Sequence, residues 1–240
     1  MLMLDGGDVG KTLNERQAWS TPILLDVMVD MGYDAMALSD RDAADTTFTW
    51  LKAGHNKNMQ MLTGNLKDGP VQAEAWTVLE KGGAKVGVVA AFPEQFARRM
   101  PQFSQEPLHA YLDESSKALD GESVDFKVLL FHGTPFAAQK LATSRKDFDV
   151  ILVGHSAGAE MGADIKDGAI PMVGPGDRGR EVAFLTLKKS PSGASVEAKI
   201  IALDGEVKDS DKADAYLEKV AKVAESKMKE WQSKRSSGTN

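Results

Sequence analysis

The chain has 240 residues and a formal net charge of −6, because 35 acidic side chains outnumber 29 lysines and arginines. Its 42 % hydrophobic and 27 % charged residues are typical of a globular protein. The acidic balance disfavours non-specific binding of nucleic acid. No apolar run reaches the about 18 residues of a membrane-spanning helix, and the absence of cysteine excludes disulfides, thiolate-held metals and thiol nucleophiles.

The first half of the chain alternates strand and helix patterns. Thr21 and Pro22 are typical of a helix start with Thr21 as the N-cap, and Gly32 is typical of a helix end. A short helix is predicted over residues 47–53. Strands are predicted over residues 1–4, 35–38 and 59–63, and a β-hairpin over 76–80 and 85–91.

The second half begins with the same alternation and ends differently. Strands 182–188 and 196–203 alternate apolar and polar residues, as half-exposed antiparallel strands do. A last helix over 211–231 places Leu217, Val220, Ala224, Met228 and Trp231 on one face, which we expect to pack against the body. The remaining elements are helices over 107–119 and 135–142 and buried strands over 126–131 and 149–153.

This order predicts a layered α/β (α+β) fold. We expect strands 35–38, 128–131 and 150–153 to be central strands of one sheet. The domain spans residues 1–205, and residues 206–240 form a C-terminal helix packed on it and a frayed tail.

Two familiar motifs are matched only in part. Residues 7–12 resemble a phosphate-binding P-loop, but Asp5 stands where its first glycine is required. Residues 154–158 match the G-x-S-x-G elbow of serine hydrolases, with Ser156 as the nucleophile. That fold needs a histidine after the serine, and all four histidines precede it, at positions 55, 109, 132 and 155. His55 and His109 are predicted to be solvated surface residues.

Four polar clusters follow predicted buried strands, at residues 5–8, 39–42, 132–133 and 154–157. Ligands bind at the carboxyl ends of strands in open α/β sheets. Each cluster taken singly is explained as a turn or a capped strand end. Taken together, two carboxylates and two imidazoles would suit a divalent transition metal.

The order of these segments resembles the calcineurin-like metallophosphoesterases, and especially the catalytic domain of the 5'-nucleotidase and UDP-sugar hydrolase branch. The resemblance covers about residues 1–205 and implies a β-sandwich flanked by helices. Five segments of the sequence show the resemblance. Residues 4–8 resemble the family's Gly-Asp motif, and residues 31–38 resemble the segment that leads to its Gly-Asn-His-Glu motif. Residues 130–133 resemble the segment with the lone His, residues 148–156 the segment that leads to Gly-His-x-His, and residues 171–174 with 179–182 the strand pair that follows.

The departures from the family pattern concern one metal site. The first motif, Asp-x-His, is absent, so the resemblance implies a sandwich lacking the first strand; Ala157 also stands where the final His is expected. The other metal site keeps a counterpart for each ligand. The resemblance therefore implies one ion at most, Mn, Zn, Co or Fe, held by Asp8, Asp40, His132 and His155.

The catalytic histidine of the family is also replaced. Residues 39–42 read Ser-Asp-Arg-Asp, so Arg41 stands in its place and Asp42 follows. The resemblance therefore implies Arg41, as a phosphate contact, and Asp42 as the catalytic residues. Arginine cannot serve as a general acid, but it can hold a phosphate bidentately. Two functions stay open: a metal-dependent hydrolase of small phosphate esters such as nucleotides, and a catalytically dead pseudo-phosphoesterase that binds an anionic ligand or partner.

The resemblance bears on partners and location. The start of the chain carries no signal peptide and falls inside the family's pattern. We expect a longer protein, whose upstream part carries Asp-x-His and a secretion signal, which would make it periplasmic or secreted. Alternatively, the open sheet edge pairs with another protomer.

Overall fold

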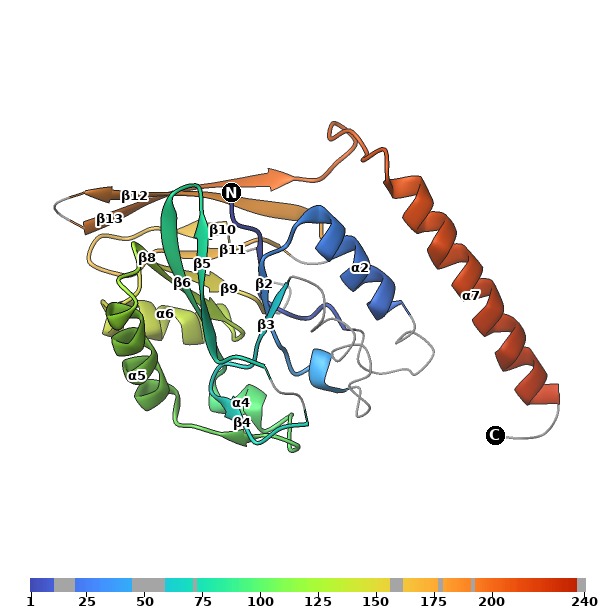
Figure 1. The fold of residues 1–240 in the computed structure, drawn as a ribbon, viewed down its shortest axis with the longest axis horizontal. Helices are drawn as coiled ribbons and strands as arrows, with labels where there is room; N and C mark the ends of the chain where they lie inside the picture. The colour runs from blue at the N-terminus through green and yellow to red at the C-terminus, as the bar shows by residue number, and fades with distance from the viewer. Residues whose placement is uncertain are drawn as a thin grey trace.

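A computed structural model of the chain describes residues 1–10, 20–44, 59–70, 73–155, 162–176, 179–190 and 193–236 (Figure 1). The helix predicted over 47–53 lies outside these residues. Most other predicted elements are confirmed, with ends shifted by a few residues.

The larger sheet has six strands in the described residues. Its central strands run parallel, and its two edge strands run antiparallel to their neighbours. Because the central strands are buried on both faces, they read as continuous apolar runs. In spatial order the strands are β10 (Gly162–Asp164), β11 (Met172–Gly174), β9 (Val150–Val153), β8 (Phe126–Phe131), β6 (Ala84–Ala91) and β5 (Trp76–Lys81).

A second β layer packs on one face of this sheet. It consists of a parallel three-stranded sheet and the antiparallel hairpin β12–β13. Side chains from both join the inner face of the larger sheet in one apolar cluster, which confirms the predicted sandwich. The strands are β1 (Leu4–Asp5), β2 (Ala35–Ala37), β3 (Gln60–Leu62), β12 (Glu181–Ser190) and β13 (Gly193–Ala202).

One prediction about these sheets is wrong. Strand β2 does not share a sheet with β8 and β9, but pairs with β1 and β3 in the opposite layer. When both faces of a strand are buried, its sequence is apolar throughout and does not indicate which sheet the strand joins. Ala35 and Ala37 of β2 face the sandwich core, while Met36 and Leu38, the residue after the strand, pack on the outer side.

Helices cover the outer faces of the sandwich (Figure 1). Helix α2 (Thr21–Met31) packs Leu25 and Met28 on the three-stranded sheet, and ends at Gly32 in the left-handed conformation. Its N-cap is Ser20 rather than the predicted Thr21. Helices α5 (Leu108–Gly121) and α6 (Pro135–Ser144) cover the six-stranded sheet.

The C-terminal helix α7 (Ala213–Ser236) lies beside α2 (Figure 1). The expected apolar face is covered only in part: Val220, Ala224 and Trp231 are half-buried, but Leu217 and Met228 are 65 % and 55 % exposed. Polar contacts also join the two helices: Lys219 pairs with Asp26 at 2.7 Å, and the Tyr216 hydroxyl bonds Asp30. Helix α2 turns its apolar side to the sheet and leaves α7 a polar side. No helix among the described residues is long and apolar enough to cross a membrane.

Four further elements lie near the carboxyl ends of the central strands and were not predicted. They are the 3₁₀ turn η1 (Asp42–Ala44), helix α4 (Glu94–Ala97), and the small antiparallel pair β4 (Leu66–Lys67) and β7 (Ser104–Gln105).

Candidate metal centre

The four predicted ligands come together at one end of the sandwich. Asp8 and Asp40 follow β1 and β2, whereas His132 and His155 follow β8 and β9. The two imidazole centroids are 5.3 Å apart. His155 Nδ1 is 3.0 Å from an Asp8 oxygen, and His132 Nε2 is 3.1 Å from an Asp40 oxygen. Both β layers therefore contribute two side chains each.

His132 is oriented by a backbone carbonyl. Its ring is fully buried, and its Nδ1 lies 3.0 Å from the Gly6 carbonyl oxygen. A carbonyl only accepts, so Nδ1 carries the proton and donates it there. Nε2, the other ring nitrogen, then faces Asp8 and Asp40, at 3.5 and 3.1 Å. Metal-ligating histidines are commonly held by such a bond from the other ring nitrogen.

The donor set fits a transition metal. One donor atom from each of Asp8, His132 and His155 lies within 4.8 Å of the others. Asp8 Oδ1 is buried and has no hydrogen-bond partner in the part of the chain that the structure describes. A buried carboxylate oxygen without a partner is costly unless a cation meets it. Two imidazoles and carboxylate oxygens are ligands that zinc, manganese, cobalt and iron accept.

The loop that presents Asp8 is held in an unusual backbone conformation. Asp8 has a φ of +66° in the left-handed region, and Gly7 a φ of +93°. The Asp8 N–H donates to Ser39 Oγ at 3.0 Å and to Asp42 Oδ2 at 3.1 Å. These bonds offset the cost of a non-glycine residue at positive φ.

Asp42, which we predicted beside Arg41 as a catalytic residue, is fully buried. Its carboxylate accepts the backbone N–H groups of Asp8, Gly10 and Ser39. Burial raises the pKa of Asp42 to about 7, although the Gly10 bond acts to lower it. This geometry suits a residue that positions the Asp8 loop, because its oxygens are already used by backbone donors.

Asp42→Ala should therefore destabilise the fold and weaken metal binding. The buried N–H groups of Gly10 and Ser39 would lose their acceptor, and the Asp8 N–H would keep only Ser39 Oγ. One buried N–H without an acceptor costs about 1–3 kcal/mol. We expect a loss of about 2 kcal/mol or more in urea unfolding, with Asp211→Ala, on the exposed surface before α7, as the control. Equal stability of the two variants would contradict the positioning role.

Electrostatics favour an ionised Asp40 and a protonated His132 imidazole. Burial alone would raise the pKa of Asp40, but hydrogen bonds from His132 and Arg99 lower it to about 2. Burial would lower the pKa of His132, yet the bond with Asp40 and the charge of Asp8 outweigh it and raise the pKa. The carboxylates of Asp8 and Asp40 both stabilise positive charge at His132 Nε2. A metal ion bound to Nε2 would meet the same two carboxylates.

Two arginines flank these carboxylates at the surface. Arg41 Nη1 is 3.6 Å from an oxygen of Asp8, and Arg99 Nη1 is 3.0 Å from an oxygen of Asp40. Arg41 is the residue predicted to contact phosphate. Arg99 was not predicted, because the segment around α4 matches none of the motifs that pointed to the site.

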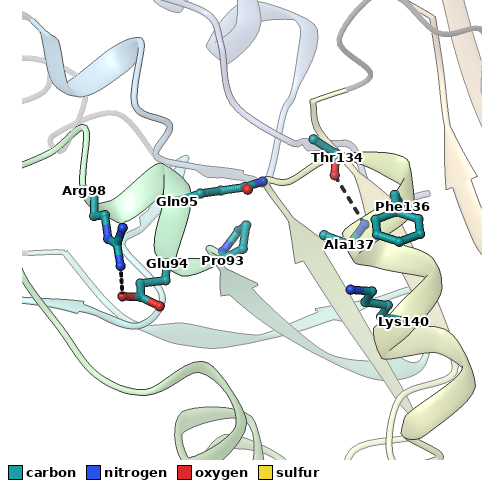
Figure 2. A pocket seen from close by; sticks show the side chains of 8 residues that line it. All are labelled: Pro93, Glu94, Gln95, Arg98, Thr134, Phe136, Ala137 and Lys140. Atoms are coloured by element: carbon teal, nitrogen blue, oxygen red, sulfur yellow. Dashed lines mark hydrogen bonds and ion pairs between the residues drawn. The ribbon is translucent and has the colours of Figure 1, made fainter.

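A groove lies between α4 and the start of α6 (Figure 2). Its volume is about 370 Å³, and Gln95 and Lys140 line it from opposite sides. Phe136 at its edge is 67 % exposed, with Lys140 Nζ 4.5 Å from the ring centroid. Thr134, which lines the groove, is two residues from His132, so the Cα atoms of these two residues are at most about 7 Å apart. The groove therefore begins close to the predicted metal ligands.

Other candidates from the sequence lie elsewhere. His109 is exposed on α5, as predicted. His55, the serine Ser156 and Ala157 lie outside the described residues.

No model of a protein family and no curated protein sequence matches the chain. Solved structures do match it in fold. A 5'-nucleotidase precursor from Thermus thermophilus superimposes with a TM-score of 0.79 at 18 % identity, over 94 % of this chain and 50 % of that one. The sulfate thiohydrolase SoxB of the same organism gives 0.76 at 19 % identity, over 90 % and 41 %. The calcineurin-like phosphoesterase YfkN of Bacillus subtilis gives 0.69 at 18 % identity, over 93 % and 83 %.

The chain therefore has the metallophosphoesterase fold, in the form found in 5'-nucleotidases. It spans half or less of the length of the first three solved structures that it matches.

Proposed function

We propose that the chain binds one divalent transition metal through Asp8, Asp40, His132 and His155, and acts on small phosphate esters as a phosphoesterase. The observation that carries this proposal is the bond from His132 Nδ1 to the Gly6 carbonyl, which leaves Nε2 directed at two carboxylates. The similar fold of 5'-nucleotidases supports the choice of phosphate esters, among them nucleotides.

The metal would polarise the phosphoryl group and lower the pKa of a bound water. The residues of this chain would supply the rest. Arg41, half exposed beside Asp8, can donate two parallel N–H bonds to a phosphate. The groove between α4 and α6 offers space for the organic part of the ester. Asp42 and Ser39 would keep the Asp8 carboxylate in place.

A second function, binding without turnover, is favoured by one residue. Arg41 stands where the resembling family carries its catalytic histidine, and a guanidinium stays protonated at any working pH. It can hold an anion but cannot protonate a leaving group. In this alternative the chain is a pseudo-phosphoesterase that retains an anionic ligand.

An assay with p-nitrophenyl phosphate separates the two functions. The chain is incubated with Mn²⁺, Co²⁺ or Zn²⁺, beside a His155→Ala variant and a sample with chelator. We expect hydrolysis that needs the metal and disappears in the variant. Tight phosphate binding with no metal-dependent hydrolysis would instead establish the binding protein. Hydrolysis that survives in His155→Ala would place the activity elsewhere.

A further inference from the structure

Helix α4 and the turn after it place an aromatic ring and an arginine on the metal centre. Phe96 is buried and meets the rings of His132 and His155 edge-on, with centroids 5.2 and 4.9 Å away. The guanidinium carbon of Arg99 lies 4.9 Å from the centroid of Phe96. Phe96 therefore supports both imidazoles and the guanidinium at once.

Arg99 reaches the cluster from this support. Its Nη1 donates to Asp40 Oδ2 at 3.0 Å, while Asp40 Oδ1 faces His132. The Arg99 side chain is still 60 % exposed, and of its five N–H donors only one, on Nη1, has an acceptor among the described residues, which is Asp40. A guanidinium stacked on a ring has its donors directed outward from its edge.

We propose that Arg99, stacked on Phe96, is an anion-binding residue for the phosphoryl group of a ligand at the metal centre. The inference rests on the proposed function and narrows its ligand class to tetrahedral dianions, such as a terminal phosphate monoester or inorganic phosphate. Arg41 and Arg99 each pair with a different carboxylate of the cluster. Two guanidiniums beside a bound divalent metal would supply the positive charge that a dianion requires.

A salt bridge that only stabilises the fold is the competing explanation for Arg99. The two explanations predict different changes in metal affinity when Arg99 is removed. If Arg99 serves only to hold Asp40 in place, its removal weakens metal binding. If Arg99 binds the anion, its removal weakens phosphate binding and leaves metal binding equal or tighter, because a cation no longer competes for Asp40 Oδ2.

The neighbouring residue provides a matched control. Arg98 pairs with Glu94 at 2.6 Å, with a side chain that is 76 % exposed. It lines the groove proposed for the organic part of an ester, and inorganic phosphate has no such part. Arg98→Gln thus removes the same charge one position away, without touching the cluster. Arg99→Lys keeps the charge and loses the planar donor edge.

The test is calorimetry in two steps, with Mn²⁺ alone and then inorganic phosphate on the Mn²⁺-saturated protein. We expect Arg99→Gln to bind phosphate at least about tenfold more weakly, since hydrogen bonds to charged groups contribute about 1.5–3 kcal/mol. Its affinity for Mn²⁺ should equal or exceed that of the wild type. Arg99→Lys should be intermediate for phosphate, and Arg98→Gln unchanged in both steps.

Wild-type phosphate affinity in Arg99→Gln, with Mn²⁺ bound normally, would overturn the role of Arg99 and leave the proposed function standing. Loss of Mn²⁺ binding in Arg99→Gln would overturn it in favour of a structural salt bridge. A wild-type chain that binds no Mn²⁺ would overturn the proposed function and this inference together.

Discussion

His132→Ala should reduce the affinity for Mn²⁺ at least about 100-fold. Changes to outer partners of metal ligands cost about 10- to 100-fold, and a ligand itself contributes more. His132 is fully buried and presents Nε2 to two carboxylates, so no other described histidine can replace it. Isothermal calorimetry with Mn²⁺ measures the change.

Two further variants make this result specific. His132→Asn keeps an amide N–H near the Gly6 carbonyl and loses only Nε2, so it separates loss of the ligand from loss of the fold. His109→Ala, on the exposed surface of α5, should bind Mn²⁺ like the wild type. A folded His132→Asn protein with unchanged affinity would remove His132 from the metal site.

Gly154→Ala should damage both the fold and the metal centre. A Cβ on residue 154 would lie 2.1 Å from the Gly6 carbonyl oxygen, the same oxygen that accepts from His132 Nδ1. Forced overpacking costs about 1–3 kcal/mol. Since the oxygen must move, the imidazole loses its orienting bond, and we expect Mn²⁺ affinity to fall about 10- to 100-fold.

Thermal unfolding and Mn²⁺ titration of Gly154→Ala check this expectation. The matched control is Gly205→Ala, where an added Cβ meets nothing within 4 Å. The control should change neither measurement. If Gly154→Ala unfolds at the wild-type temperature and binds Mn²⁺ normally, the close contact between the backbones of Gly6 and Gly154 is not needed for the fold or for metal binding.

Local patterns predicted most of the elements that form this fold and the four polar clusters at its end, and the family resemblance then selected Asp8, Asp40, His132 and His155 within them. Residues 126–131 and 149–153 are apolar runs followed at once by polar residues, which is how buried parallel strands end. The pairing of β2 was not predictable in this way. Its side chains alternate between two apolar surfaces, so neither face indicates a sheet.

Residues outside these patterns escaped prediction for a different reason. Phe96 lies in a helix of one turn, and Arg99 lies in the turn after it. A helix this short is too brief to show a repeating pattern of apolar residues in the sequence. The exposure of Leu217 on α7 depends on the polar side of α2, two distant segments whose contact no local pattern encodes. Asp42 was recognised through its motif, but only the structure shows that its oxygens are taken up by backbone N–H groups.

The most direct test of the metal centre is the anomalous diffraction of a crystal of the full chain grown with Mn²⁺. We expect one manganese peak per chain, within about 2.3 Å of His132 Nε2, His155 Nδ1 and an Asp8 oxygen. Two peaks in the cluster would contradict the single site. A peak that contacts neither histidine, or no peak at a saturating concentration, would contradict the metal centre itself.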